Sequence, residues 1–381
     1  MKICHLIYDD LGNPWLSGGG AVRAREIYRR LAERHQITLI TGRYPGARSE
    51  ERKEGMRFVR VGPAQKEASQ GGYARSRLAY CRRAVAALQA EEYDLWVHEF
   101  SAFAPLWAPW PVRRRGLLLF QHFVGRHALK KNPMIGGFAW AAEIWTLRAY
   151  QRIVAVSPSV QARIRKAVGG RAVQIDCVYN GVDARFFALE PEEAPYILYF
   201  GRADLHAKGI DVLLDAFARI APDYPELALK MAGRGSPHQL ARVDRLVQRH
   251  HLAARVEAVG EVDEVGQEEL LRRALFVCMP SRYEGWGMVA VEAAAAGKAV
   301  LGTRISGLKD AVRHGETGLL VEAGREEALA QGMRCLLDDD SKRWRLGVQA
   351  RQWALRFDWD RIAREQEEVY LRVARENRPQ A

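Results

Sequence analysis

Several features that assign a protein class directly are absent from this sequence. The 381-residue chain has no CxxC pair among its five cysteines, which are Cys4, Cys81, Cys177, Cys278 and Cys335. This scatter argues against a zinc site and indicates a reducing compartment. Met1 leads directly into a strand-like run, so we expect no signal peptide. The longest apolar candidate, Phe100 to Val112, is shorter than a membrane span and contains three prolines.

Acidic residues are scarce relative to basic ones, but only in the first half of the chain. Residues 1–190 hold 30 Lys+Arg against 16 Asp+Glu, a net charge of +14, whereas residues 191–381 hold 28 against 30, a net charge of −2. An arginine-rich solvated surface would account for the basic half. Contact with an anionic partner, such as a membrane surface or a charged acceptor, would account for it equally well.

Alternating strand-like and helix-like runs predict a parallel α/β architecture, and the length predicts two domains. We expect the first domain at residues 1–190, ending after the turn dipeptide Asn180-Gly181 and at the Pro/Glu-rich linker 189–195. A helix is predicted over residues 21–35. The strands of this half are predicted at residues 2–8, 36–41, 56–61, 94–98, 116–123, 152–157 and 173–179.

The same pattern restarts after the linker, which predicts a second domain at residues 191–358. Its strands are expected at residues 196–201, 227–232, 256–260, 275–280, 299–302 and 318–321, and residues 211–221 form an amphipathic helix. Residues 326–376 are predicted to be almost entirely helical.

The segment from Glu284 to Glu292 carries the strongest chemical information. Glu284 follows the strand-like run 275–281 in a Gly-rich turn, and Glu292 is predicted to lie about two turns into a helix. Open α/β sheets bind ligands at the carboxyl edge of the strands, and helix N-termini favour anions. The segment therefore indicates a site for a ligand that is both sugar-like and phosphorylated.

Two further strand-to-helix loops could approach such a ligand. Arg202 and Lys208 follow the first strand of the second half, where a guanidinium and an ammonium suit phosphate oxygens. Gly18, Gly19 and Gly20 follow the first strand of the chain and permit close backbone approach. Taken alone, the glycine loop is equally compatible with a plain tight turn, and the Arg202/Lys208 motif fits two surface cations in a loop better than a phosphate site.

A histidine and a tryptophan-rich stretch add two open questions. His122 ends a predicted strand and could act on a proton or donate a hydrogen bond, although a structural role is as compatible; His98 has a weaker claim. Trp96, Trp107, Trp110, Trp140 and Trp145 lie in a stretch that also contains Arg113-Arg114-Arg115 and Lys130-Lys131. Tryptophans mixed with cations suit a membrane interface, and they also suit ordinary helix packing.

Two acidic clusters are better explained as helix ends than as metal ligands. Asp338-Asp339-Asp340 reads as a solvated turn between helices. Asp358-Trp359-Asp360 resembles a metal-binding DxD but opens a late helix, where an Asp N-cap explains it. We therefore expect no metal site.

Taken together, these motifs resemble the family 4 retaining glycosyltransferases, which have the GT-B fold. The segment Glu284 to Glu292 resembles that family's E-x7-E motif, and Gly201-Arg202 with Lys208-Gly209 resembles its phosphate-binding motif. Residues 178–183 and 315–321 also resemble family segments. The resemblance covers nearly the whole chain. It implies two Rossmann-like domains with parallel sheets facing a central cleft, with the last helix, from about Trp359 to 381, completing the first domain.

The resemblance also implies roles for individual residues. Arg202 and Lys208 would neutralise the diphosphate of a nucleotide-sugar donor, Glu292 would bind its ribose and Glu284 its sugar. Other donor contacts would come from Gly287, Met288 and Val289, and from Gly19 and Gly20. His122 would lie near the reacting sugar. The groups expected to be catalytic are His122, Arg202, Lys208 and Glu284, with neither metal nor cofactor required.

The function implied is a retaining hexosyl transfer from a UDP- or GDP-sugar to a glycan or lipid-linked acceptor of the cell envelope. We expect a cytoplasmic enzyme, peripheral on the inner face of the membrane, with no nucleic-acid partner. A nucleotide-sugar 2-epimerase of related fold is one alternative. A non-catalytic protein that binds membrane or nucleic acid is the other, and it would lack affinity for nucleotide sugars.

Overall fold

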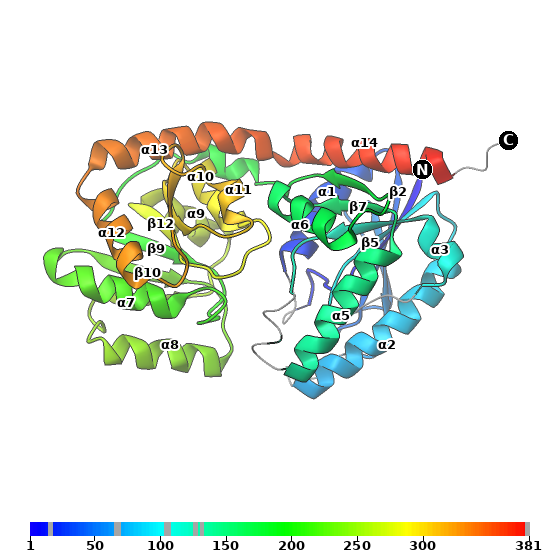
Figure 1. Cartoon of the computed structure of the whole chain (residues 1–381), viewed down its shortest axis with the longest axis horizontal. Coiled ribbons are helices and arrows are strands. Elements are labelled where there is room, and N and C mark those ends of the chain that lie inside the picture. Colours follow the sequence, from blue (N-terminus) through cyan, green and yellow to red (C-terminus); the bar gives the residue numbers. More distant parts are fainter. Residues whose placement is uncertain (14–17, 65–69, 103–107, 125–128, 130–132, 378–381) are drawn as a thin grey trace. The chain divides into compact units, whose positions relative to one another are not determined.

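A computed structural model of the chain describes residues 1–13, 18–64, 70–102, 108–124, 129 and 133–377. It divides into two compact units (Figure 1). Unit 1 comprises Met1–Asn180 and Trp359–Ala381, and unit 2 comprises Gly181–Asp358. The division falls at the Asn180-Gly181 turn dipeptide, whereas the sequence predicted a boundary at residue 190.

Unit 1 is built on an eight-stranded sheet with the order β3-β4-β2-β1-β5-β6-β7-β8. All neighbours are parallel except β3 and β4. The strands are β1 (Lys2–Leu6), β2 (Gln36–Gly42), β3 (Glu50–Lys53), β4 (Met56–Val61), β5 (Leu95–Glu99), β6 (Gly116–Phe120), β7 (Arg152–Ala155) and β8 (Gln174–Cys177). Its helices are α1 (Gly19–Leu31), α2 (Gln70–Gln89), α3 (Trp110–Arg114), α5 (Pro133–Ala149), α6 (Pro158–Val168) and α14 (Trp359–Asn377).

Unit 2 contains a six-stranded, all-parallel sheet with the order β11-β10-β9-β12-β13-β14. Its strands are β9 (Tyr196–Phe200), β10 (Ala228–Ala232), β11 (Val256–Gly260), β12 (Phe276–Met279), β13 (Val300–Thr303) and β14 (Gly318–Val321). Its helices are α7 (Ile210–Ile220), α8 (Pro237–Arg249), α9 (Glu264–Arg273), α10 (Met288–Ala295), α11 (Leu308–Ala311), α12 (Glu326–Leu337) and α13 (Asp340–Ala354), with 3-10 turns η1 (Ala184–Ala188), η2 (Ala221–Asp223) and η3 (Leu355–Phe357). This is a doubly wound sheet: successive strands are added on one side of β9 up to β11, and on the other side from β12 onwards. The switch point lies between the parallel strands β9 and β12.

The central strands are largely buried and mostly apolar because helices cover both faces of each sheet. Every residue of β6, Gly-Leu-Leu-Leu-Phe, is buried. Trp96 and Phe120 lie fully buried in the core of unit 1, and Phe217 and Phe276 do so in that of unit 2. These cores hold the strand ends, and therefore the loops that follow them, in fixed positions.

One strand was missed by the sequence analysis. β3 has the sequence Glu-Glu-Arg-Lys and pairs antiparallel with β4 at the edge of the unit 1 sheet. Charged residues are a common protection of edge strands, so the segment lacks the apolar alternation that marks a strand. The predicted strands otherwise occur, with ends shifted by a few residues.

The last helix, α14, packs against α1 within unit 1 (Figure 1). The hydroxyl oxygens of Tyr28 and Tyr370 lie 2.9 Å apart, and Arg30 Nε donates to Asp360 Oδ1 at 2.5 Å. Among the described residues, no helix combines the length and the apolar character needed to cross a bilayer.

Candidate active site

The loop after β9 carries the first pair of predicted site residues. Arg202 is exposed, and its carbonyl oxygen accepts a hydrogen bond of 2.7 Å from the Tyr199 hydroxyl. Asp204 folds the loop, because its Oδ1 accepts from the backbone N–H of Ala207 at 3.0 Å. Gly209, the N-cap residue of α7, lies in the left-handed region at φ 68°. The loop therefore ends with Lys208 directly at the N-terminus of a helix.

The loop after β12 lies against it, because β12 is the neighbour of β9. A Cβ atom on Gly209 would lie 2.0 Å from the carbonyl oxygen of Pro280, so only glycine permits this approach. Gly287, at φ 89°, precedes α10, whose first residues are Met288 and Val289. The first backbone N–H groups of a helix have no partner within it, so they can serve a ligand.

The two loops are joined by an ion pair between Lys208 Nζ and Glu284 Oε1. Both side chains are largely buried, with 19% and 13% of their surface exposed. Ser281 Oγ donates to the same Glu284 oxygen at 3.1 Å. Glu284 and Lys208, predicted separately from two motifs, thus come together at the switch point of the sheet. Arg202 belongs to the same loop as Lys208.

A second connection between these loops was missed by the sequence analysis. The Arg282 guanidinium donates to both carboxylate oxygens of Asp211, at 2.7 and 2.9 Å. It also donates to the carbonyl oxygen of His206 at 2.9 Å, and the Arg282 backbone N–H donates to that of Ala207 at 2.9 Å. Arg282 therefore fixes the loop that carries Lys208 relative to the loop that carries Glu284. No sequence pattern marks this pair, since 71 residues separate its members.

Glu292 lies one turn into α10, not two, because the helix begins only at Met288. Its Oε2 accepts from Gln267 Nε2 at 2.9 Å, and Gln267 Oε1 accepts in turn from Arg185 Nη2 at 2.9 Å. Burial raises the pKa of Glu292 to about 7, although Arg185 and Gln267 oppose the shift. The carboxyl group can therefore exchange a proton near neutral pH.

In unit 1, Gly19 and Gly20 form the first turn of α1, after the N-cap residue Gly18. A Cβ atom on Gly20 would lie 2.7 Å from Glu99 Oε1, so the helix start lies directly against the end of β5. Ser17, which precedes this loop, falls outside the described residues. Because β5 is the neighbour of β1, the glycines lie at the switch point of the unit 1 sheet.

His122 is exposed and lies two residues after the end of β6. Its neighbour Gln121 donates to Glu99 Oε1 at 2.8 Å and accepts from Asn180 Nδ2 at 3.1 Å. These bonds hold the backbone on which His122 sits. His98 differs: it is fully buried against the Tyr150 hydroxyl at 3.0 Å, and burial lowers its pKa to about 3. His98 is therefore a neutral core residue.

Arg23 is a further residue that the sequence did not single out. It is 1% exposed and donates from Nη1 to the Tyr179 carbonyl oxygen at 2.5 Å and to Asn180 Oδ1 at 2.8 Å. Its Nη2 donates to Gln366 Oε1 at 2.6 Å. Burial lowers the pKa of the guanidinium. Arg23 thereby ties α1 to the segment after β8 and to α14.

Other features of the described residues do not form a site. No three His, Cys, Asp or Glu side chains among them come together in an arrangement that could hold a metal ion. A cavity of about 570 Å³ is lined by Lys2, Gln36 and Arg57, among others. It lies where β1 and β2 begin, and parallel sheets bind ligands at the opposite edge.

Comparison with protein families gave two matches that together span most of the chain. The family described as Glycosyl transferases group 1 matches residues 183–353, and Glycosyltransferase Family 4 matches residues 17–186. Among curated proteins, a glycogen synthase of Mycobacterium tuberculosis is 32% identical over 67% of this chain and 63% of its own length. A phosphatidyl-myo-inositol mannosyltransferase of the same species is 33% identical over 58% of this chain and 59% of its own. The matches thus span about 60% of these relatives.

Solved structures match over almost the whole chain. A sucrose-phosphate synthase from Thermosynechococcus elongatus has a TM-score of 0.85 at 24% identity, covering 98% of both chains. The Anabaena protein HepE in complex with UDP-glucose has a TM-score of 0.73 at 21% identity, covering 97% of this chain and 99% of its own. At these identities the likeness shows the fold, and that fold is GT-B, as predicted.

Proposed function

Since the chain belongs to the glycosyltransferases of group 1 and family 4, we propose that it is a retaining hexosyltransferase. It would move a sugar from a UDP- or GDP-sugar to a glycan or lipid-linked acceptor of the cell envelope. The observation that carries the proposal is the Lys208–Glu284 ion pair at the β9/β12 switch point, beside Arg202 and the N-terminus of α10. That combination of charges suits a sugar diphosphate.

The leaving group of such a reaction is a nucleoside diphosphate, so negative charge grows on it as the sugar departs. Arg202 and Lys208 would stabilise that charge from the β9 loop. Because these two cations and the helix N-termini supply the positive charge, the proposed reaction requires neither a metal nor a cofactor. Retention means that the acceptor attacks the face from which the diphosphate leaves.

The remaining residues of unit 2 would orient the donor. Glu284 would accept hydrogen bonds from the sugar hydroxyls, and the backbone of Gly287, Met288 and Val289 would donate to them. Glu292 would bind the ribose hydroxyls. The Lys208–Glu284 pair supports this division, since each side chain already stabilises the charge of the other where the diphosphate and the sugar would meet.

Unit 1 would supply the acceptor side. Gly19 and Gly20 would approach the diphosphate with their backbone, and His122, exposed at the end of β6, would lie near the reacting sugar. The basic character of residues 1–190 supports an anionic or membrane-bound acceptor. The name of the mannosyltransferase relative, which refers to a phosphatidyl-inositol, agrees with a lipid-linked acceptor. We place the enzyme in the cytoplasm, peripheral on the inner face of the membrane.

Thermal unfolding with nucleotides tests the donor site directly. A ligand at 100 times its Kd stabilises the folded state by about 2.7 kcal/mol, so UDP, GDP and ADP, followed by their sugars, should separate clearly. The preferred nucleotide sugar should raise the melting temperature of the wild type and of Arg219→Ala, a control at an exposed ion pair with Glu326. It should raise that of Arg202→Ala much less.

The outcomes distinguish the proposal from its alternatives. Interconversion of the donor sugar without any acceptor would identify a 2-epimerase instead. Absence of a shift with every nucleotide and nucleotide sugar would contradict the proposal and favour a non-catalytic binding protein.

A further inference from the structure

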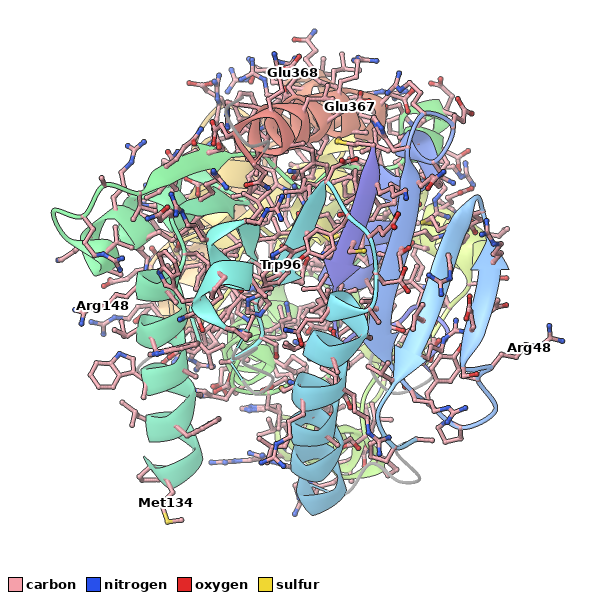
Figure 2. The ribbon with its side chains drawn as sticks, turned by 90° about the vertical axis from the view of Figure 1, so that its right-hand side faces the viewer. Arg48, Trp96, Met134, Arg148, Glu367 and Glu368 are labelled. Atoms are coloured by element: carbon pink, nitrogen blue, oxygen red, sulfur yellow. The ribbon has the colours of Figure 1, made fainter. Side chains whose placement is uncertain are left out.

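The outer face of α5 is apolar and aromatic although it lies on the surface. Met134, Phe138 and Trp145 are exposed by 85%, 44% and 39%. With Ala141 and Arg148 they recur every three or four residues, so they form one stripe along the helix. The stripe runs from Met134 to Arg148 on this 17-residue helix, which gives it a length of about 21 Å. Figure 2 shows Met134 at one end of α5 and Arg148 at the other.

The short helix α3 extends this stripe with cations. The Arg113 guanidinium lies 5.1 Å from the centroid of the Trp145 ring, which joins the two helices. On α3 itself, Arg114 lies 5.5 Å from the centroid of the Trp110 ring, and Trp110 is 60% exposed. We name the combined surface the α3–α5 face; it comprises Trp110, Arg113, Arg114, Met134, Phe138, Trp145 and Arg148.

The charge of this face has one sign. The only acidic residue in α3 or α5 is Glu143. Glu143 is 2% exposed and its side chain accepts from the backbone N–H of Val124 at 2.8 Å, so it is buried and does not contribute to the surface charge. The arginines therefore stand among aromatic rings without an exposed carboxylate from either helix.

The structure also separates the tryptophans that the sequence had grouped. Trp96 is fully buried in the core of unit 1, and its indole donates to the Val112 carbonyl oxygen at 2.9 Å. Trp107, Lys130 and Lys131 lie outside the described residues. Trp140 is 45% exposed, and among the described residues Trp110 and Trp145 combine exposure with an adjacent guanidinium.

We propose that the α3–α5 face docks on an anionic phospholipid bilayer. Contiguous exposed apolar side chains mark surfaces of interaction. Indole rings and long arginines fit the headgroup region, where an apolar body and a polar or charged tip are both accommodated. The single sign of charge selects anionic lipid.

In the docked state α5 lies parallel to the bilayer surface, with Met134, Phe138 and Trp145 entering the boundary between headgroups and acyl chains. Arg113, Arg114 and Arg148 contact lipid phosphates. Either contribution alone gives weak binding, so the two are required together. The role of the docking rests on the proposed function, because it would bring unit 1 to a lipid-linked acceptor. The docking itself needs no sugar donor.

Vesicle sedimentation with the full chain tests the proposal. Vesicles of phosphatidylcholine alone are compared with vesicles that also contain phosphatidylglycerol. The wild type should bind only the anionic vesicles, and added salt should weaken that binding. The double variant Phe138→Ser/Trp145→Ser should bind at least tenfold more weakly. Arg113→Gln/Arg114→Gln should lose about fivefold per arginine, because each cation near an anionic surface contributes about that factor.

Trp344 provides a matched control. It is exposed by 41%, lies on α13 of unit 2, and has the Lys298 ammonium 5.8 Å from its ring centroid. Trp344→Ser should therefore bind vesicles like the wild type. Circular dichroism should show that all variants keep the fold, since every substituted side chain is at least partly exposed.

Three results would overturn the proposal: no binding to anionic vesicles, equal binding to neutral ones, or the same loss in Trp344→Ser as in the α5 variant. A fourth would reassign the face. If the wild type sediments as a dimer and Phe138→Ser/Trp145→Ser as a monomer, the face joins two copies of the chain instead. Donor binding should be unchanged in all these variants, so failure of the docking and failure of the glycosyltransferase proposal are distinguishable.

Discussion

The polar side chains at the switch points of the two sheets differ in how accessible they are. At the β9/β12 switch point of unit 2, charged side chains stand on loops, and Lys208 and Glu284 remain partly accessible. At the β1/β5 switch point of unit 1, polar side chains turn inward. Glu99 accepts from Gln121, and the Arg23 guanidinium donates to three oxygens on two segments; these residues have 9% and 1% of their surface exposed.

This difference shows that topology locates a ligand edge without deciding what the edge does. In unit 2 the charges are positioned where a diphosphate could compete for them. In unit 1 the charges stabilise the unit itself, and Gly19 and His122 are exposed near this edge. The accessible charges of unit 2 are therefore suited to binding a charged ligand. The buried charges of unit 1 instead stabilise the fold of that unit.

The largest effect is expected from the charges of unit 2. Glu284→Ala and Arg202→Ala should each lower kcat/KM of sugar transfer by about 100- to 1000-fold, as removal of one electrostatic partner of a transition state does. Steady-state transfer with the preferred donor measures this. The fold should persist, and Arg219→Ala should transfer normally. Full activity in both site variants would contradict the proposed roles.

The complementary substitution in unit 1 should affect stability. Arg23→Met leaves the Tyr179 carbonyl, Asn180 and Gln366 without their donor, so the free energy of unfolding should fall by about 3 kcal/mol. Urea denaturation measures the loss. Arg25→Met, on the same helix, removes a more exposed pair with Glu54 and should cost less than about 1 kcal/mol. Equal losses in both variants would refute the contrast between buried and exposed charge.

Arg282 tests whether unit 2 also needs internal support. A lysine lacks the two-pronged geometry that binds both oxygens of Asp211, so Arg282→Lys should lower kcat/KM by about tenfold. Because Arg282 acts through Asp211, Asp211→Asn should have a similar effect, and the double variant should be little worse. Lys230→Ala, which breaks a pair with Glu257 on the same sheet, is the control. Additive losses would show that Arg282 and Asp211 act separately.

The smallest effect concerns pH. The pKa of Glu292 is raised from 4.5 to about 7, chiefly by burial, so folding favours its protonated form. The contribution of protonated Glu292 to the stability of the folded state is complete below pH 4.5 and is lost as the pH rises through about 7. Glu292→Gln should therefore gain stability relative to wild type between pH 5 and pH 8. We expect about 1–2 kcal/mol, below the full linkage value because the side chain is partly exposed. Melting curves across this range should show no gain if the carboxyl group titrates normally.

The sequence predicted the strand-helix alternation because most buried parallel strands are predominantly apolar runs bounded by turn residues. It also placed Arg202, Lys208 and Glu284 in loops after strands, where the structure has them. It predicted His122 at the end of a strand, but β6 ends at Phe120 and His122 lies in the loop that follows. It failed where the signal was weak or nonlocal. β3 was missed because a charged edge strand has no apolar alternation, and Trp96 was grouped with the exposed tryptophans because spacing does not report burial.

What the sequence alone determined is therefore the order of elements and the chemistry of each loop, since both depend on residues close together in the chain. Only the tertiary structure decided which loops meet. Lys208 and Glu284 are 76 residues apart, and they pair because β9 and β12 are neighbours in the sheet. Arg23 and Gln366 are 343 residues apart and meet because α14 belongs to unit 1. Strand order and helix return are set by packing of the whole chain, which no local pattern contains.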